Sequence, residues 1–387
     1  MPDIPILDVL LHGDAIGTLH LLPGERSLFA FDQAYIDDRW RDLLSLSFKD
    51  SRGGLIDSVA PARGRLPPFF ANLLPPGSKR GVDARRAFIL LAALGRDLPG
   101  AVTIRPAQGE AWPPIAAPPA GNELSFPAHK NTDGGFTLAA EGVGGSWVVK
   151  LPSSQLDGLC ENEFALMVLA ARVGIDVTPF DLVARADIAG VPDGLAAPTG
   201  RALLLKRGDR SFGQAVHMET FAQVFGIWPD DERDHKNPKA SCCDIAGVLA
   251  VETGNAGVAE FIRRLVFNTL IGNAEMPLEN WSLIYPDRRT AALAPAGGFV
   301  STVAHRPATH AALTYGRTRR MDGLTADELA YIAGKAGLSE RLVLDTARET
   351  VERFCAAWQR DRQDLPLTHH ATASLEAHLK TLPIARI

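Results

Sequence analysis

The sequence has few cysteines, and this argues against a disulfide framework or a thiolate metal site. Cys160, Cys242, Cys243 and Cys355 follow no metal-ligand spacing in a chain of 387 residues. The adjacent pair Cys242 and Cys243 is poorly placed to form a disulfide with itself. We therefore expect a protein of a reducing compartment, the cytoplasm.

Long apolar runs and an excess of positive charge are also missing. No run approaches the roughly 20 residues that a membrane-spanning helix needs, and residues 1–5 lack the basic head of a signal peptide. We expect a soluble protein that does not enter a membrane. The net charge of -5 gives no bulk attraction to nucleic acid, so we expect any DNA contact to be made through a partner.

The first third of the chain predicts a small α+β module followed by a linker. Residues 6–22 alternate apolar and polar side chains around Gly13, which indicates a β-hairpin. An apolar run over 88–94 predicts a helix with Gly95 as its C-terminal cap. Residues 106–121 are too rich in proline for a helix or a central strand. We assign residues 1–105 to the module and 106–121 to the linker.

The rest of the chain is apolar enough for a second, larger unit, since 46% of all residues are hydrophobic. Alternation and helical spacing predict strands, one helix, another strand and then helices. The predicted strands cover 135–139, 146–151 and 201–207, and the predicted helices cover 162–172, 244–252, 258–271, 325–336 and 339–358. This order predicts a small β-rich lobe over 122–210 and a mostly helical lobe over 211–387, which is the layout of a kinase.

Three runs in the N-terminal module resemble the hallmark runs of one family. They cover residues 44–47, 68–75 and 91–102. In this respect the chain resembles the HipA family of bacterial serine/threonine toxin kinases, from HipBA-type toxin–antitoxin modules. The resemblance implies an α+β, two-lobe protein-kinase-like fold with an extra N-terminal α+β module and a mostly helical C-terminal lobe.

The resemblance also implies residues for nucleotide binding. Lys150 corresponds to the strand lysine that contacts the ATP phosphates, and Glu163 to its carboxylate partner. Spacing alone favours a lysine that merely ends a strand beside solvent, and only the resemblance reverses this interpretation. Leu205 and Arg207 occupy the place of the hinge that contacts adenine, although Lys206 and the following glycine differ from the usual hinge residues.

The phosphate loop of the family corresponds to residues 124–130. Pro127 has no amide to donate and Phe126 replaces a small residue, so we expect a compromised phosphate cradle with Lys130 as its remaining cation. Gly142, Gly144 and Gly145 are better explained as a hairpin turn.

The family's catalytic loop corresponds to residues 273–280. Asn273 and Asn280 match its asparagines, while Glu275 stands at the aspartate that acts as base, Pro277 at the histidine and Glu279 at the lysine. A base misplaced by about 1 Å can cost on the order of a hundredfold in rate. We also expect Glu279 to reverse the charge beside the transferred phosphoryl group.

The metal-binding aspartate of the family corresponds to Gly298, so that Asn280 is the remaining implied metal ligand. Glu275, Glu279 and Asn280 could form a makeshift metal site instead. His217, His305 and His310 follow no ligand spacing and are expected to be structural or surface residues. ATP and Mg2+ are the implied cofactors, with weakened binding expected for both.

The sequence therefore predicts a HipA-like pseudokinase with weak or no phosphoryl transfer. Its expected partners are an antitoxin-like helix-turn-helix protein or a paralogous HipA-like kinase. The main alternative is an active ATP-dependent serine/threonine kinase with Glu275 as base, or an enzyme that catalyses another nucleotide transfer. A folded remnant without a role is the third.

Overall fold

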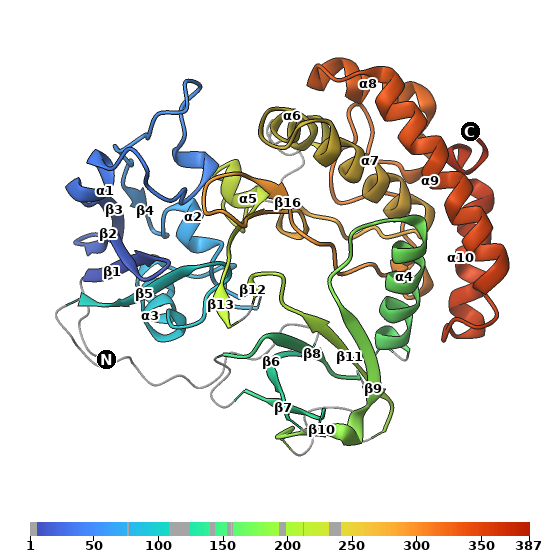
Figure 1. Cartoon of the computed structure of the whole chain (residues 1–387), viewed down its shortest axis with the longest axis horizontal. Helices are drawn as coiled ribbons and strands as arrows, with labels where there is room; N and C mark the ends of the chain where they lie inside the picture. The colour runs from blue at the N-terminus through green and yellow to red at the C-terminus, as the bar shows by residue number, and fades with distance from the viewer. Residues whose placement is uncertain are drawn as a thin grey trace.

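The computed structural model describes residues 6–75, 77–107, 124–132, 134–139, 144–152, 156, 158–192, 199–211, 213–231 and 241–387. Most of the predicted linker lies outside these residues, as does Gly142. Buried apolar side chains form three clusters, one in the N-terminal module, one in a small sheet and the largest among the C-terminal helices. The same three parts can be followed by colour in Figure 1.

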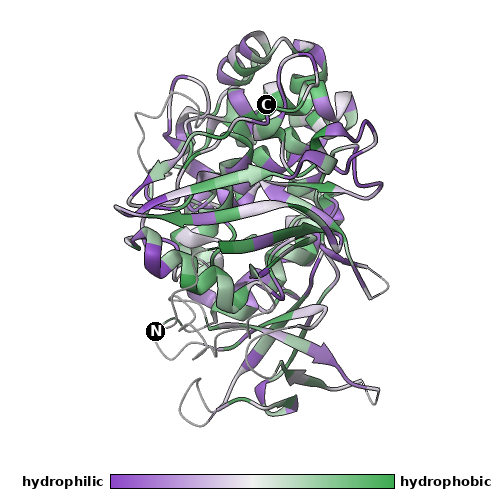
Figure 2. Ribbon diagram, turned by 90° about the vertical axis from the view of Figure 1, so that its left-hand side faces the viewer, coloured by the Kyte–Doolittle hydropathy of each residue, from purple (hydrophilic) through white to green (hydrophobic). Residues whose placement is uncertain are grey.

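The N-terminal module is a five-stranded antiparallel sheet in the order β4-β3-β2-β1-β5, accompanied by short helices. Its elements are β1 Ile6–Leu11, β2 Asp14–Leu22, β3 Arg26–Phe31, α1 Gln33–Asp37, β4 Ala62–Arg63, α2 Pro68–Ala71, α3 Ala84–Leu94 and β5 Val102–Pro106. The predicted hairpin is confirmed, with Gly13 in its turn at φ +93°. Figure 2 looks onto this sheet and shows hydrophobic and hydrophilic residues interspersed along its strands.

Gly95 follows α3 as predicted, but the physical reason differs. Its φ of -58° is right-handed, so it does not form the left-handed cap that glycine usually provides. A Cβ at this position would lie 1.9 Å from the backbone oxygen of Ile104. Glycine is therefore required here by the close approach of α3 to β5.

The second part is a six-stranded sheet in the order β10-β7-β6-β8-β11-β9. Its strands are β6 Ser125–Lys130, β7 Phe136–Leu138, β8 Trp147–Lys150, β9 Phe180–Ala184, β10 Ile188–Ala189 and β11 Arg201–Lys206. The strands predicted over 135–139, 146–151 and 201–207 are confirmed to within about a residue at each end. The alternation did not reveal β9, β10 or β6.

The C-terminal part is mostly helical, as predicted. Its elements are β12 Arg210–Ser211, β13 Gln214–Ala215, β14 His217–Thr220, α5 Phe221–Val224, α6 Cys242–Glu252, α7 Gly254–Leu270, β15 Ser282–Tyr285, β16 Ala292–Leu293, α8 Ala326–Ala336, α9 Glu340–Asp361 and α10 His369–Thr381. Helix α4 (Leu159–Val173) belongs to the small lobe by sequence order, yet its buried face is part of the large cluster. None of the described helices is long and apolar enough to cross a membrane.

The first hallmark run is the segment by which the N-terminal module docks onto β14. The ring of His217 is fully buried, and its Nε2 lies 2.7 Å from the backbone oxygen of Leu44. The carboxyl group of Glu219, also fully buried, accepts hydrogen bonds from Ser45 Oγ at 2.5 Å and from the Leu46 amide at 3.0 Å. Burial raises the pKa of Glu219 to about 7 and lowers the pKa of His217 to about 4. His217 is thus a structural histidine.

Candidate functional site

The structure brings Lys150 and Glu163 together. Lys150 ends β8, and Glu163 lies early in α4, whose first residue follows Gly158 in a left-handed conformation at φ +69°. The two oxygens of Glu163 lie 2.8 and 3.1 Å from Lys150 Nζ, and the Glu163 side chain is 2% exposed. The alternative that Lys150 merely ends a strand beside solvent is therefore wrong.

Asn162, beside Glu163, fixes this end of α4 to the segment that follows Gly298. Its Nδ2 donates to the backbone oxygen of Ser301 at 3.2 Å, and its Oδ1 accepts from the Ser301 amide at 3.0 Å. His305 Nε2 lies 3.1 Å from the same Nδ2. Sequence reasoning gave Asn162 no role, although it stands between Glu161 and Glu163.

Lys130 does not lie with Lys150. The expected phosphate loop over 124–130 is wrong, because residues 125–130 form β6 and their backbone groups pair with β7 and β8. Ser125 is the register partner of Lys150, so Lys130 is five residues, or about 17 Å, further along the strand. Its Nζ lies 5.8 Å from the ring centre of Phe136, in the range of a cation–π contact.

Arg207, in the segment that we expected to be the hinge, contacts the N-terminal module. Arg207 places its Nη1 2.9 Å from Asp97 Oδ2 and its Nη2 3.0 Å from Asp209 Oδ2. Arg210 bonds to both aspartates as well, at 2.5 and 2.9 Å. The Arg207 amide donates to the backbone oxygen of Ser146. The structure therefore places Arg207 in an ion cluster instead of the adenine contact that the resemblance implied, while Leu205 is half-buried in β11.

This ion cluster explains part of the third hallmark run, because Asp97 belongs to it. Asp97 Oδ2 also accepts the amide of Gly144 at 2.7 Å, which ties the segment just before β8 to the module. Burial raises the pKa of Asp97, but Arg207 and Arg210 outweigh it and the net pKa is lowered. The sequence signal was the charge pattern of residues 207–210, which we had assigned only to the hinge.

The 273–280 loop follows α7 through Gly272, which has φ +67° and would place a Cβ 2.5 Å from Val303. Asn273 shapes the loop, because its Oδ1 accepts the amide of Glu275 at 3.1 Å and its Nδ2 donates to Asn268 Oδ1 at 2.9 Å. Asn273 thus has a structural role in the described loop.

Glu275 and Asn280, the predicted catalytic residues, lie together but contact each other through the backbone. Asn280 Nδ2 donates to the backbone oxygen of Glu275 at 3.2 Å. The carboxylate of Glu275 is 61% exposed and pairs with Arg306 Nη2 at 2.8 Å. The carboxylate that stands at the position of the family's catalytic base is therefore paired with an arginine at the surface.

Glu279 does not present a free negative charge, which corrects our expectation. Its carboxylate pairs with Lys79 Nζ, and its Oε1 lies 3.3 Å from Arg80 Nη2. Both cations come from the N-terminal module. The charge change at position 279 is thus matched by cations about 200 residues away in the sequence.

Mg2+ does not fit the described side chains well. Gly298 has φ +75° and open space around an added Cβ, so it supplies room but no ligand. The carboxylates of Glu275 and Glu279 are each paired with a cation, which disfavours the makeshift site. Among the described residues, no three His, Cys, Asp or Glu side chains gather as a metal-binding group. Mg2+ needs several well-placed oxygen ligands.

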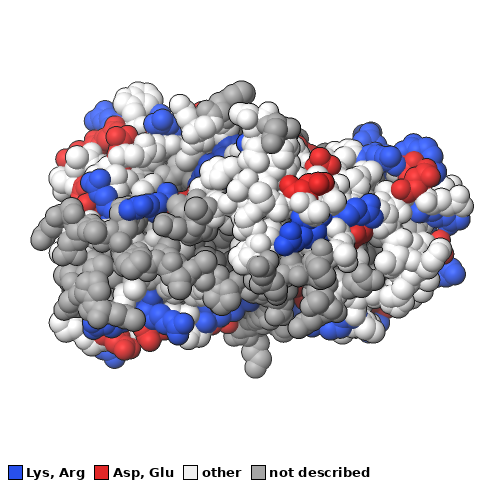
Figure 3. Space-filling model, turned by 90° about the horizontal axis from the view of Figure 1, so that it is seen from below, with Lys and Arg blue, Asp and Glu red and all other residues white. Residues whose placement is uncertain are grey.

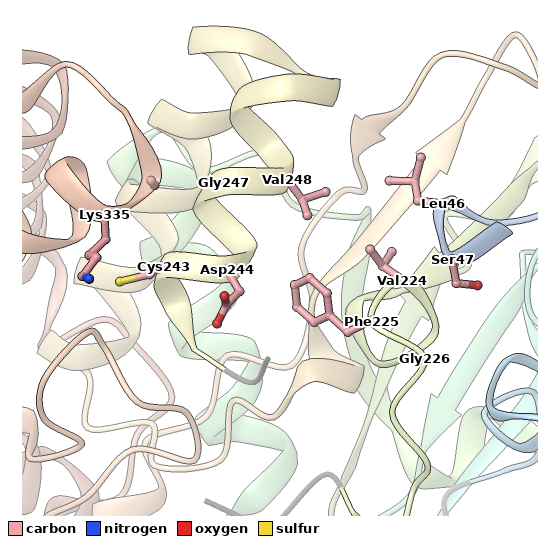
Figure 4. A pocket seen from close by; sticks show the side chains of 11 residues that line it. Leu46, Ser47, Val224, Phe225, Gly226, Cys243, Asp244, Gly247, Val248 and Lys335 are labelled. Carbon is pink, nitrogen blue, oxygen red and sulfur yellow. The ribbon is translucent and has the colours of Figure 1, made fainter. Parts of the chain in front are cut away.

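Two cavities differ in size and place. One of about 20 Å3 lies beside Asn273, Asn280 and Gly298 and has room for about one water molecule. The other, of about 650 Å3, lies where the module meets α5, α6 and α8. Figure 4 shows Leu46, Phe225 and Val248 around this groove.

Comparisons with known proteins agree with a two-lobe, kinase-like fold. Residues 7–105 match the HipA N-terminal domain and residues 125–358 match the HipA-like C-terminal domain. The solved HipA of Shewanella oneidensis, described in a complex with HipB and operator DNA, superposes with a TM-score of 0.72 at 18% identity, covering 98% of this chain and 96% of that one. At that identity the likeness shows the fold alone.

Curated relatives point the same way. The putative kinase Y4dM of Sinorhizobium fredii is 48% identical over 100% of this chain and 99% of its own length. The putative kinase Y4mE of the same organism is 26% identical over 84% of this chain and 86% of its own. The chain belongs to the HipA family, as the resemblance in its sequence predicted.

Proposed function

We propose that this HipA-family protein is a pseudokinase with weak or no phosphoryl transfer and that it acts by binding a partner protein. The observation that carries the proposal is the state of the 273–280 loop, in which both carboxylates are paired with cations while Gly298 offers no ligand. Kinase chemistry relies on metal ions that bridge the phosphates and neutralise the developing charge. Position 298 supplies no ligand for these ions, which leaves Asn280 as the remaining implied ligand.

The Lys150–Glu163 pair supports nucleotide binding as a remaining property. Lys150 would contact the phosphates of ATP, and Glu163 would keep its side chain in place. We propose that any ATP binding gains little from Mg2+, because the metal donor set is incomplete.

The proposed partner is an antitoxin-like helix-turn-helix protein, with a paralogous HipA-like kinase as the second candidate. The solved HipA of Shewanella oneidensis was described in a toxin–antitoxin complex with HipB and operator DNA. Figure 3 shows positive and negative side chains intermixed over the described part of one face. The net charge of -5 favours DNA contact through a partner. The groove between the module and α6 is the surface that we propose for the partner.

Calorimetric titration with ATP, with and without Mg2+, tests the first half of the proposal, together with an assay of phosphate transfer from labelled ATP. We expect the affinity to change little with Mg2+ and no transfer to be measurable. Mg2+-dependent, micromolar binding with transfer that Glu275→Gln abolishes would instead establish the active kinase that uses Glu275 as base.

Co-expression with the proteins encoded beside this one tests the second half. We expect an antitoxin-like protein to co-purify, and Val248→Asp in the groove to abolish the association. Val251→Asp is the matched control, because Val251 lies on the same helix and is 81% exposed. Lack of any association, or equal loss in both variants, would contradict the proposed surface.

A further inference from the structure

A turn of the N-terminal module reaches the 273–280 loop. Lys79 in this turn places its Nζ on the carboxylate of Glu279, and the two side chains are only 4% and 17% exposed. Arg80 approaches the other oxygen of Glu279 at 3.3 Å. A lysine buried to this degree needs a paired carboxylate, because an unpaired ammonium is costly away from water.

The turn is fixed by several other contacts, so the ion pair is part of a built interface. Arg80 Nε donates to the backbone oxygen of Pro229 at 3.1 Å, and the Gly81 amide donates to Asp230 Oδ1 at 2.9 Å. Asn72 Nδ2, earlier in the module, donates to the backbone oxygen of Ile227 at 2.8 Å. These contacts therefore hold the turn so that the Lys79 ammonium lies beside Glu279.

Glu279 is well placed to transmit this constraint. It lies in the short 3-10 helix η5 (Leu278–Asn280), directly before Asn280. Asn280 in turn donates to the backbone oxygen of Glu275. Holding Glu279 therefore holds both residues that stand at the family's catalytic positions.

The loop residue at this interface differs in charge from the family pattern. Where the resemblance has a lysine in the loop, this chain has Glu279, and the cations come from the module. Lys79 and Arg80 both contact the carboxylate of Glu279. Position 279 therefore cannot be changed to lysine alone without placing three cations together.

We infer that Lys79 is a positioning residue of the kinase-like site, which makes the N-terminal module a part of that site. Lys79 acts through Glu279 to hold residues 273–280. The inference goes beyond the proposed function and holds whether or not the loop transfers phosphate.

Hydrogen exchange of the amides in residues 273–282 tests this inference on the full chain. Lys79→Glu and Glu279→Lys are each expected to speed exchange by about tenfold or more, because each leaves like charges buried together. The double variant Lys79→Glu, Glu279→Lys restores one opposite pair, and we expect its exchange to return to within about threefold of the unchanged protein. Lys79→Arg keeps the cation and is expected to change exchange little.

Lys49→Glu is the matched control, because it breaks another cross-module ion pair, Lys49 Nζ to Glu252 Oε1 at 2.8 Å. A purely structural docking role predicts that Lys49→Glu loosens residues 273–282 as much as Lys79→Glu does. If a charge reversal prevents folding, Lys79→Gln takes its place, with the same expected direction. Equal effects from positions 49 and 79, no effect from either single variant, or no recovery in the double variant would overturn the inference.

Discussion

Two ion pairs in the kinase-like part of the molecule each join a cationic side chain to a glutamate at 2.8 Å but have different surroundings. In the Lys150–Glu163 pair the side chains are 19% and 2% exposed, whereas in the Arg306–Glu275 pair they are 75% and 61% exposed. Solvent screens an exposed pair, which contributes little to stability, while a buried pair fixes both partners. The α4 side is thus a built structure, and the base position of the 273–280 loop is a solvated surface.

The largest expected effect comes from breaking the buried pair. Glu163→Gln removes the negative charge of a buried carboxylate that pairs with Lys150, and we expect the free energy of unfolding to fall by about 3 kcal/mol. Urea unfolding measures this change. Glu161→Gln is the control on the same helix, since its partner Arg201 is 46% exposed. A loss below about 1 kcal/mol for Glu163→Gln would mean that burial does not distinguish the two pairs.

Glu219 extends the comparison to a carboxyl group that is fully buried among hydrogen-bond donors. Because burial raises its pKa from 4.5 to about 7, the folded protein holds this proton more tightly than the unfolded chain does. The stability that Glu219 contributes is therefore present at low pH and is lost as the pH rises from about 4.5 to about 7, by a few kcal/mol.

The variant Glu219→Gln isolates this dependence. As the pH rises from about 4.5 to about 7, we expect the unchanged protein to lose unfolding free energy relative to Glu219→Gln. His217 acts in the opposite sense, because its lowered pKa makes stability fall as the pH drops from about 6.5 to about 4. His217 is present in both proteins, so its contribution cancels when their unfolding free energies are subtracted. A pH-independent difference would refute the prediction.

The next effect concerns the link between α4 and the segment after Gly298. Asn162→Ala removes both hydrogen bonds to the Ser301 backbone, and we expect a loss of about 2 kcal/mol because buried backbone groups lose their partner. Hydrogen exchange should become faster in residues 299–305 before it does so elsewhere. Uniform acceleration over the whole chain would show that Asn162 does not act locally.

Replacing Gly298 by aspartate is expected to lower stability by a smaller amount and to strengthen the binding of ATP with Mg2+. Gly298→Asp adds a carboxylate into open space but places a side chain at φ +75°, at a cost of about 1 kcal/mol. We expect ATP binding to become stronger in the presence of Mg2+, as measured by calorimetry. Gly298→Ala carries the backbone cost without the carboxylate, and an equal gain in that control would exclude the metal explanation.

The smallest effect is expected for the exposed pair. Glu275→Gln removes a screened interaction with Arg306, and we expect the free energy of unfolding to change by less than about 0.5 kcal/mol. The urea midpoint at low and high salt checks this expectation. A loss comparable to that of Glu163→Gln would erase the contrast between the two sides.

Much of the fold could be predicted from the sequence because its signals are local. The helix starts at Thr325 and Ser339 are confirmed, and each side chain accepts the expected hydrogen bond from the first turn of its helix. Helix α10 was missed because only Ala371 and Leu375 of its residues are buried, so it carries a weak apolar pattern. Strand β6 was missed because Pro127 and the family comparison pointed to a loop.

The sequence by itself determined the broad order of strands and helices and, through the family resemblance, the family and the pairing of Lys150 with Glu163, which lie 13 residues apart. Only the tertiary structure decided that Arg207 binds Asp97, 110 residues away, and that Glu279 binds Lys79, 200 residues away. Local periodicity is encoded by neighbouring residues, whereas these contacts exist only once the N-terminal module has docked onto the two lobes. A charged residue shows its type in the sequence, but its partner and its burial arise from packing.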